Sequence, residues 1–386
     1  LAASANGPAL LERLREEQGI HLVWLPWKRP GFELGLWLES AIAQNPGCDG
    51  VILGSHGLFT WGATSRESYV STLRVLDAIG KFVVPRIEAR GTARFGGQVA
   101  ATRDDRDALV AAVAPVLRGA FTKASGKRPV MHYHATPDVL EFVNSADVAK
   151  LAARGTSCPD HFLRTKVKPM LVEWDVTSGT AENLIDAAKA ALPAYADDYR
   201  AYYEANREPE SPAMRGSDPS VILIPGVGLL SFGKNAAEAR VTGEFYTNAI
   251  HVMDGATSLG DLASAAADID AQMVCDNYVS LPAKEAFNIE YWALEEAKLQ
   301  RMPAEKEMAR RVVVVVGAGP GIGRAVARRV LTEGAVVVCA DIQANLAEET
   351  AEVLRSEFGK DAAVGVAVDI TNRESVQQLY AAAALR

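Results

Sequence analysis

One stretch decides the fold of the C-terminal part of the chain: Val312-Val-Val-Val-Val-Gly-Ala-Gly-Pro-Gly-Ile-Gly-Arg324. Five consecutive valines are typical of a strand in a parallel sheet, so we expect both faces of this strand to be covered. Glycines follow at once, and a helix is predicted over residues 324–333. The succession of strand, glycine turn and helix predicts the first unit of a Rossmann fold.

The glycine turn has the spacing of a phosphate cradle. Gly317, Gly321 and Gly323 form G-x-x-x-G-x-G, and Gly319 is a further small residue between them. Backbone N–H groups at a helix start bind phosphate oxygens, and the helix dipole adds favourable partial charge. We therefore predict that a dinucleotide binds at these four glycines and at Ile322.

Two further strands are predicted at residues 335–340 and 363–368. The first ends at Asp341, 18 residues after Gly323. A carboxylate at this place accepts hydrogen bonds from the ribose hydroxyls and repels a 2′-phosphate, which predicts NAD rather than NADP. The other strand ends at Asp369 and Ile370, which we expect beside the adenine ring.

This segment resembles the short-chain dehydrogenase/reductase family, from about Arg311 to Arg386. In that family G-x-x-x-G-I-G is the cofactor turn, and an acidic residue after the second strand selects NAD. Val316 stands where most members carry Thr. The family's catalytic Tyr-x-x-x-Lys pair is not found after Asp341, since four alanines follow Tyr380. The resemblance implies NAD binding with unknown catalytic residues, in a domain that lacks its C-terminal part.

Composition bounds the remaining possibilities. A chain of 386 residues, 49% hydrophobic and 23% charged, is expected to form two or three globular domains of about 150 residues. A net charge of −8 offers no basis for nucleic-acid binding. No apolar run approaches the roughly 20 residues of a membrane span, and no signal peptide is visible. Four scattered cysteines suggest a reduced, cytoplasmic protein.

An internal repeat occupies the first 310 residues. Residues 50–62 align with residues 220–233 at a constant offset of 171, and seven identities, including Gly57/Gly228 and Gly62/Gly233, support a duplication. Each copy predicts a strand, a tight turn, a strand and a helix opened by a capping box. The predicted capping pairs are Thr64 with Glu67, and Asn235 with Glu238.

The two copies differ at the turn, where His56 in the first corresponds to Val227 in the second. Val51-Ile-Leu-Gly-Ser-His-Gly-Leu-Phe-Thr-Trp-Gly62 resembles the third-ligand motif of the class II aldolase/adducin family. There the turn histidine joins an upstream His-x-His pair on a divalent metal, which stabilises the enediolate formed by carbon–carbon cleavage. The resemblance implies that His56 is a metal ligand, with zinc as the expected ion.

The upstream pair of that motif is not found, because the histidine before His56, His21, has no His-x-His partner. We therefore expect a chain truncated at both ends, inactive alone, with an absent or weak metal site. His132-Tyr-His134 would present both imidazoles on one face of a strand, but we favour surface histidines there, because Val227 removes the third ligand. The basic residues at 158–168 could bind a sugar phosphate, although exposed charge is the favoured interpretation.

These landmarks divide the chain. We predict a class II aldolase-like first unit at residues 1–125, a degenerate second unit at 126–300, a linker at 301–308 and an NAD-binding Rossmann domain, here the dinucleotide domain, at 309–386. In the second unit a helix over residues 181–191 is expected to break at Pro193. The fold class is thus α/β, an aldolase/adducin-like α/β/α region followed by the first part of a Rossmann domain.

The domain order resembles the bifunctional rhamnulose-1-phosphate aldolase/lactaldehyde dehydrogenase family. It implies cleavage of a ketose 1-phosphate in rhamnose catabolism, followed by NAD-dependent oxidation of the aldehyde. One alternative is an NAD-dependent short-chain dehydrogenase with a non-catalytic, adducin-like assembly domain, and another is a sugar-binding module without a reaction. Because aldolase relatives often build sites between subunits, we expect a homo-oligomer that acts on sugar phosphate and aldehyde substrates.

Overall fold

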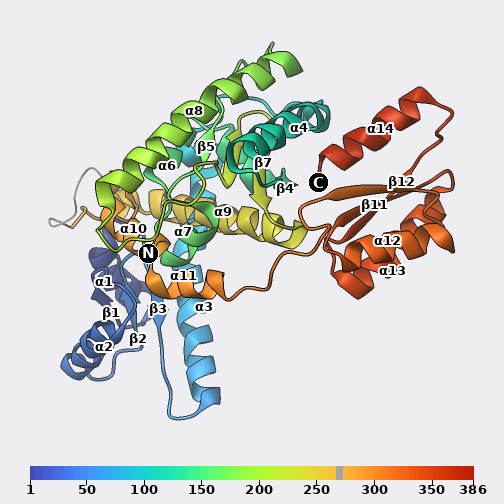
Figure 1. Cartoon of the computed structure of the whole chain (residues 1–386). Coiled ribbons are helices and arrows are strands. Elements are labelled where there is room, and N and C mark those ends of the chain that lie inside the picture. Colours follow the sequence, from blue (N-terminus) through green and yellow to red (C-terminus); the bar gives the residue numbers. More distant parts are fainter. Residues whose placement is uncertain (267–272) are drawn as a thin grey trace.

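The computed structural model describes residues 1–266 and 273–386. Figure 1 shows the dinucleotide domain beside the second unit and the first unit at the other end of the molecule. In the described residues the main strands form three sheets, ordered β1-β2-β3, β4-β7-β6-β5 and β10-β11-β12. The predicted α/β class is therefore observed in each of the three regions.

The first unit packs helices on a small mixed sheet, in which β1 is parallel to β2 and β2 is antiparallel to β3. Its core joins side chains of α1, the sheet and α3, among them Leu14, Ile52 and Phe82. The elements are α1 (Gly7–Gln18), β1 (Leu22–Leu25), α2 (Phe32–Gln44), β2 (Gly50–Leu53), β3 (Gly57–Phe59), α3 (Ser65–Arg90), the 3-10 helix η1 (Gly91–Gly96) and α4 (Arg106–Ser125).

The second unit is built on a four-stranded sheet with α9 packed against β4 and β7. The elements are β4 (Val130–His134), α5 (Pro137–Val143), α6 (Val148–Arg154), α7 (Pro159–Thr165), β5 (Met170–Leu171), α8 (Ala181–Asn206), β6 (Val221–Ile224), β7 (Gly228–Gly233), α9 (Ala236–Thr257), the 3-10 helix η2 (Gly260–Leu262), β8 (Val274–Cys275), β9 (Tyr278–Val279), α10 (Ala283–Glu290) and α11 (Ala293–Gln300).

The expected break of the 181–191 helix at Pro193 is wrong, since α8 continues through that residue to Asn206. A proline removes one helical hydrogen bond, and tertiary packing on both sides of it offsets the loss. Tyr195 and Tyr199 beyond the proline are buried, as is Leu184 before it. The buried face is therefore continuous along α8.

The structure confirms the strand, turn, strand and helix order of both repeats. Leu53 pairs with Gly57 in the first hairpin, and Ile224 pairs with Gly228 in the second, which is the same register. The Gly62/Gly233 identity has a steric cause, because a Cβ on Gly62 would lie 2.3 Å from Ser68 N and one on Gly233 2.5 Å from Ala239 N. Each glycine therefore lets its strand approach the following helix closely.

Both predicted N-caps are present. The N–H of Glu67 donates to Thr64 Oγ1 at 3.2 Å, and the N–H of Glu238 donates to Asn235 Oδ1 at 2.8 Å. The reciprocal half of the capping box differs from the prediction. Glu67 accepts from the N–H of Ala63, one residue before the cap, and Glu238 forms an ion pair with Lys234 instead.

The dinucleotide domain is a three-layer α/β unit with a parallel sheet in the order β10-β11-β12. Side chains of α12 and α13 form the core on one face, and those of α14 form it on the other. Its elements are β10 (Val312–Val316), α12 (Ile322–Thr332), β11 (Val336–Asp341), α13 (Ala344–Phe358), β12 (Ala363–Ala367) and α14 (Arg373–Ala384).

The expectation that the five valines are covered on both faces is wrong for β10. Only Val315 is buried, and Val316 is 52% exposed. The buried strand is β11, whose residues 336–340 are all buried. The difference arises because β11 has a partner on each side, whereas β10 pairs with β11 alone among the described residues.

One helix in the described residues, α4, has the length and apolar composition that a membrane span needs. Core helices of soluble proteins pass the same test. In this structure α4 packs against α8, and its Val110, Val113 and Leu117 are buried in the core that α8 shares with β6. Its apolar face is therefore used in packing against the second unit.

Candidate functional site

The predicted cofactor residues gather at one end of the parallel sheet, where the carboxyl ends of its strands lie. We call this end the carboxyl edge. The glycine turn follows β10, Asp341 ends β11, and Asp369 follows β12 by two residues. Register pairs Val316 with Ala340 and Asp341 with Ala367, so the three segments leave the sheet side by side. Ligands of open parallel sheets bind at this kind of edge.

The three motif glycines are needed for different reasons. Gly317 has φ +75° and Gly321 has φ +117°, conformations that side chains disfavour. Gly323 is restricted by space, because a Cβ there would lie 1.9 Å from the carbonyl oxygen of Gly317. The turn therefore folds back on itself so closely that glycine alone fits at its helical end.

The turn presents the N-terminus of α12 to the carboxyl edge. Gly321 occupies the N-cap position, so no side chain caps the helix. The N–H of Ala318 donates to the carbonyl of Ala340 at 3.0 Å and ties the turn to β11. The first N–H groups of a helix need acceptors, and phosphate oxygens meet that need.

Asp341 lies at the carboxyl edge and is also hydrogen-bonded to the glycine turn. Its Oδ2 accepts from the N–H of Gly319 at 3.1 Å, and its Oδ1 accepts from the N–H of Gln343 at 3.0 Å. A Cβ on Gly319 would lie 3.3 Å from Asp341 Oδ2. The sequence predicted a ribose contact for Asp341, whereas its contact with Gly319 is a feature that only the folded turn reveals.

Asp369 and Ile370 lie at the same edge. Asp369 Oδ1 accepts from the N–H and the hydroxyl of Thr371, at 2.9 and 2.7 Å, and these hydrogen bonds lower the pKa of Asp369. Ile370 is 67% exposed, and Ile342, which the sequence analysis missed, is 71% exposed. The signal for Ile342 was its place directly after Asp341. Two exposed aliphatic side chains on neighbouring strand ends suit the flat face of a base.

His56 lies in the β2–β3 turn, as predicted. Its ring centroid is 5.9 Å from that of Trp27 and 6.1 Å from that of Phe59, and burial lowers its pKa. Its Nδ1 is buried without a hydrogen-bond partner in the described part of the chain. Residues 1–266 and 273–386 contain no group of three His, Cys, Asp or Glu side chains that could hold a metal ion. The residues present therefore do not fit a metal by themselves.

His132 and His134 are half-buried, so the expectation of surface histidines is only partly met. Both rings lie on one face of β4, as alternation requires, with centroids 4.4 Å apart. His134 Nε2 lies 3.1 Å from Ser231 Oγ, and burial lowers its pKa to about 4. A Cβ on Gly243 of α9 would lie 1.8 Å from that Nε2. His134 is therefore packed beneath α9, which has a glycine where the ring needs space.

The basic residues at 158–168 are held by protein partners. Lys166 donates to the carbonyls of Gly216 and Asp218, and Lys168 forms an ion pair with Asp198. The guanidinium of Arg164 lies over the ring of Phe245, at 5.1 Å. These contacts show intramolecular roles for the cations that the sequence offered as a sugar-phosphate site.

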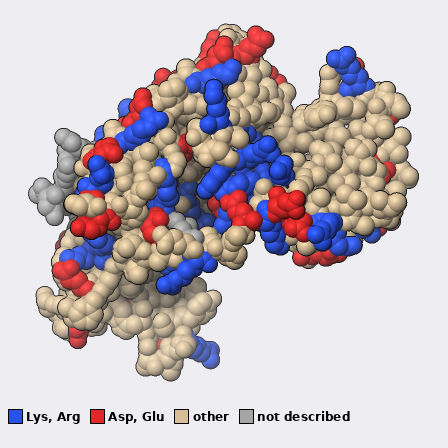
Figure 2. Space-filling model, viewed as in Figure 1, with Lys and Arg blue, Asp and Glu red and all other residues tan. Residues whose placement is uncertain are grey.

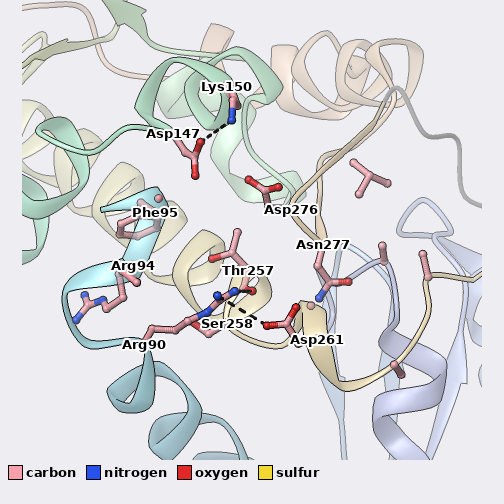
Figure 3. A pocket seen from close by; sticks show the side chains of 17 residues that line it. Arg90, Arg94, Phe95, Asp147, Lys150, Thr257, Ser258, Asp261, Asp276 and Asn277 are labelled. Carbon is pink, nitrogen blue, oxygen red and sulfur yellow. Dashed lines mark hydrogen bonds and ion pairs between the residues drawn. The ribbon is translucent and has the colours of Figure 1, made fainter. Parts of the chain in front are cut away.

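A cavity of about 530 Å³ lies between the first and second units (Figure 3). Three cations and three carboxylates line it, so its charges balance. Arg90 donates to the carbonyl of Thr257 at 2.8 Å, and Lys150 donates to Asp147 at 2.7 Å. The lining includes neither the glycine turn nor His56. The first contact joins the end of α3 to the end of α9, and the second lies at the start of α6.

Comparisons with known proteins agree with this architecture. Residues 108–299 match the family described as aldolase class II, second domain, and residues 311–386 match short chain dehydrogenase. The first match includes α4, which packs on the second unit. The chain therefore joins a class II aldolase region to a short-chain dehydrogenase region, a combination that supports an enzyme.

Two curated relatives extend the comparison. The Bacillus subtilis (strain 168) protein named uncharacterized oxidoreductase YuxG is 34% identical over 387 residues, which covers all of this chain and 53% of the relative. The meso-2,3-butanediol dehydrogenase of Serratia marcescens is 38% identical over 69 residues, 18% of this chain and 26% of that enzyme. The chain spans about half the length of the first relative.

Proposed function

We propose that this chain belongs to a bifunctional sugar-catabolic enzyme whose dehydrogenase half binds NAD at the carboxyl edge of β10, β11 and β12. The observation that carries the proposal is the Gly317–Gly323 turn beside the Asp341 carboxylate. The residues fit the cofactor, because the turn leaves the N-terminus of α12 uncapped and Gly323 has no space for a side chain. Bound NAD supplies the hydride acceptor for oxidation of an aldehyde.

The chain's own groups divide the work of binding. The N–H groups at the start of α12 hold the pyrophosphate, with the helix dipole favouring its charge. Asp341 accepts hydrogen bonds from the ribose hydroxyls while it keeps Gly319 in place. Ile342 and Ile370 lie against the adenine, with Asp369 at its rim. Hydride transfer needs further residues that we do not assign.

NAD is preferred over NADP for an electrostatic reason. A 2′-phosphate would lie against the Asp341 carboxylate, and like charges in contact repel. Arg324, near the turn, already pairs with Glu349 at 2.7 Å and donates to Thr350 at 3.0 Å. Its guanidinium is therefore held along α13 by other partners.

For the aldolase half we propose retro-aldol cleavage of a ketose 1-phosphate, such as rhamnulose 1-phosphate, in a cytoplasmic homo-oligomer. The turn motif around His56 and the family match at residues 108–299 support this proposal. His56 would be one ligand of a divalent metal, with zinc suited to imidazole. The described residues do not complete such a site.

One observation favours an alternative, an NAD-dependent dehydrogenase with a non-catalytic assembly region. Val227 fills the second turn, is fully buried and has its carbonyl bound by the Tyr133 hydroxyl at 2.8 Å. That copy of the hairpin is therefore maintained by packing without a metal-binding side chain. Aldol cleavage by the full-length protein that is lost in His56→Ala would exclude the alternative.

Calorimetric titration of the 386-residue chain with NAD and NADP tests the dehydrogenase half. We expect NAD to bind more tightly than NADP in the wild type. Asp341→Ala should weaken NAD about tenfold, since hydrogen bonds to charged groups contribute about 1.5–3 kcal/mol. The matched control is Asp369→Ala, which removes a carboxylate at the rim and should change affinity less. Equal affinity for NAD and NADP in the wild type would contradict the role of Asp341.

A further inference from the structure

The dinucleotide domain meets the second unit at the end of its sheet opposite the carboxyl edge. A cavity of about 300 Å³ lies at this meeting place, lined from the second unit by Met131 and His132 and from the dinucleotide domain by Val336 and Ala363. Val336 and Ala363 are the first residues of β11 and β12. We call this space the junction cavity.

The junction cavity is bordered by direct contacts between the two parts. Arg240 of α9 donates from Nε to Asp361 Oδ2 at 2.8 Å, and their side chains are only 19% and 16% exposed. The N–H of Met131 donates to the carbonyl of Arg386 at 3.2 Å, and α14 packs on α4. Contacts on several sides of the cavity therefore join the second unit to the dinucleotide domain.

Most of the charged side chains that line the cavity are cations. Arg355, Lys360 and Arg386 contribute cationic side chains, and Asp361 is the one carboxylate side chain among the described lining residues. Arg240 pairs with Asp361 and also with Glu244 of its own helix. Arg355 shares its charge with Glu348, at 2.5 Å, so Lys360 and Arg386 are the lining cations without a side-chain carboxylate partner among residues 1–266 and 273–386. Figure 2 shows Lys and Arg atoms gathered where the second unit and the dinucleotide domain meet, with acidic atoms beside them.

Two buried nitrogen atoms of the lining have no hydrogen-bond partner among the described residues. His132 Nδ1 and Arg386 Nε are buried and have no hydrogen-bond partner within residues 1–266 and 273–386. Buried polar atoms in native proteins nearly always have partners. An arginine Nε can only donate, so the missing partner of Arg386 is an acceptor. One atom comes from each part, His132 from the second unit and Arg386 from the dinucleotide domain.

This cavity is separate from the proposed cofactor site. Asp341 and Val336 are opposite ends of β11, and a six-residue strand places its ends roughly 17 Å apart. NAD at the carboxyl edge and a small ligand at the amino ends of β11 and β12 would therefore occupy different places.

We propose that the junction cavity binds the phosphate group of a small metabolite, which bridges the second unit and the dinucleotide domain. Arginine and lysine are the side chains that suit phosphate oxygens. A volume of about 300 Å³ is large enough for a phosphate with a short organic remainder. Bound phosphate accepts from Arg386 and Lys360 on one side and from His132 on the other. The second unit, which has Val227 in place of the turn histidine, then serves as the platform on which the dinucleotide domain docks.

Calorimetry with inorganic phosphate, at constant ionic strength, tests the site in the intact 386-residue chain. Wild type should bind one phosphate, and Lys360→Glu should weaken binding about tenfold or more. Lys360 is exposed, so this substitution should leave the fold unchanged. The matched control is Lys189→Glu, the same charge change on the exposed face of α8, which should bind phosphate as the wild type does. No phosphate binding by the wild type, or an equal loss in both variants, would overturn the proposal.

Two further measurements locate the phosphate. Saturating NAD should leave phosphate affinity unchanged, whereas competition would assign the phosphate to the glycine turn instead. The bridging role is tested by trypsin cleavage in the exposed linker, which contains Arg301 and Lys306. Phosphate should slow this cleavage in the wild type and have no effect in Lys360→Glu. Binding without protection of the linker would refute the bridge between the two parts.

Discussion

Replacement of Gly323 by alanine is the sharpest test of the glycine turn. The added Cβ would lie 1.9 Å from the Gly317 carbonyl oxygen, whereas the closest ordinary carbon–oxygen contacts are about 3.3 Å. The two groups must therefore separate by about 1.4 Å. Because the obstacle is backbone, no side-chain rotation relieves it. We expect Gly323→Ala to destabilise the dinucleotide domain by about 3 kcal/mol, at the upper end of usual overpacking costs.

The same displacement should reduce NAD affinity. It moves the first N–H groups of α12 away from the pyrophosphate, and each hydrogen bond to a charged group contributes about 1.5–3 kcal/mol. Loss of one such contact weakens binding about 10- to 100-fold. Titration calorimetry with NAD measures the affinity, and urea unfolding followed by circular dichroism measures the stability. Separate transitions for the domains are to be expected in a chain of this organisation.

The control is Gly80→Ala, inside α3, where nothing lies within 4 Å of the place that the new Cβ would take. It should leave NAD affinity unchanged and stabilise the first unit by about 0.5–1 kcal/mol, the usual gain of alanine over glycine in a helix. If Gly323→Ala bound NAD as tightly as the wild type, and unfolded at the same urea concentration, the close approach of Gly323 to Gly317 would be refuted.

Three other predictions concern packing and charge. The hydroxyl of Tyr199 donates to Oε1 of the buried Glu290 carboxylate at 2.5 Å. Tyr199→Phe removes this donor and should lower the free energy of unfolding, measured in urea, by about 1–3 kcal/mol. An unchanged free energy of unfolding would show that another donor replaces the hydroxyl. The folded-state pKa of His134 is lowered to about 4, below its ordinary value of about 6.5, so unfolding takes up a proton and stability falls as pH falls from about 6.5 to 4. His134→Gln should lack this pH-dependent contribution to stability. The difference in free energy of unfolding between the wild type and the variant should therefore be smaller at pH 4.5 than at pH 7. An equal difference at the two pH values would contradict the lowered pKa of His134. Arg240→Asp breaks the ion pair with Asp361 and should speed tryptic cleavage of the linker. The double variant Arg240→Asp with Asp361→Arg restores opposite charges and should restore protection. Equal cleavage rates in all three proteins would show that the ion pair contributes nothing to docking.

The dinucleotide domain could be predicted from sequence because its signals are local. The strand, the glycine turn and Asp341 follow one another within about 30 residues, and each depends on its own neighbours. The exposure of β10 could not be predicted in this way, because it depends on which strands pair with it. The hydrogen bond from Gly319 to Asp341 depends on how closely the turn approaches β11. That distance is a property of the folded sheet.

The second unit shows the same limit at longer range. The alternation of His132 and His134 predicted that both rings share one face, and the structure confirms it. Their partial burial could not be predicted, because the space for His134 is left by Gly243, more than 100 residues later. Pro193 misled the helix prediction for a similar reason, since buried tyrosines beyond it hold α8 together. In both cases long-range packing, which the local sequence does not reveal, determined the structure.

The internal repeat connects these observations to the roles of the two units. At the turn, the first copy retains His56 and the second has Val227, whose carbonyl is bound by Tyr133. On the following helix, the position that is an exposed Tyr69 in α3 is Arg240 in α9, where it pairs with Asp361. The second copy of the repeat, which lacks the turn histidine, is thus the copy whose helix α9 forms the ion pair with the dinucleotide domain. A Tyr at position 240 would remove that ion pair while the hairpin and the helix cap stay intact, so Arg240→Tyr should loosen the dinucleotide domain without unfolding the second unit. Such a result would separate the docking role of this copy from its role in the fold.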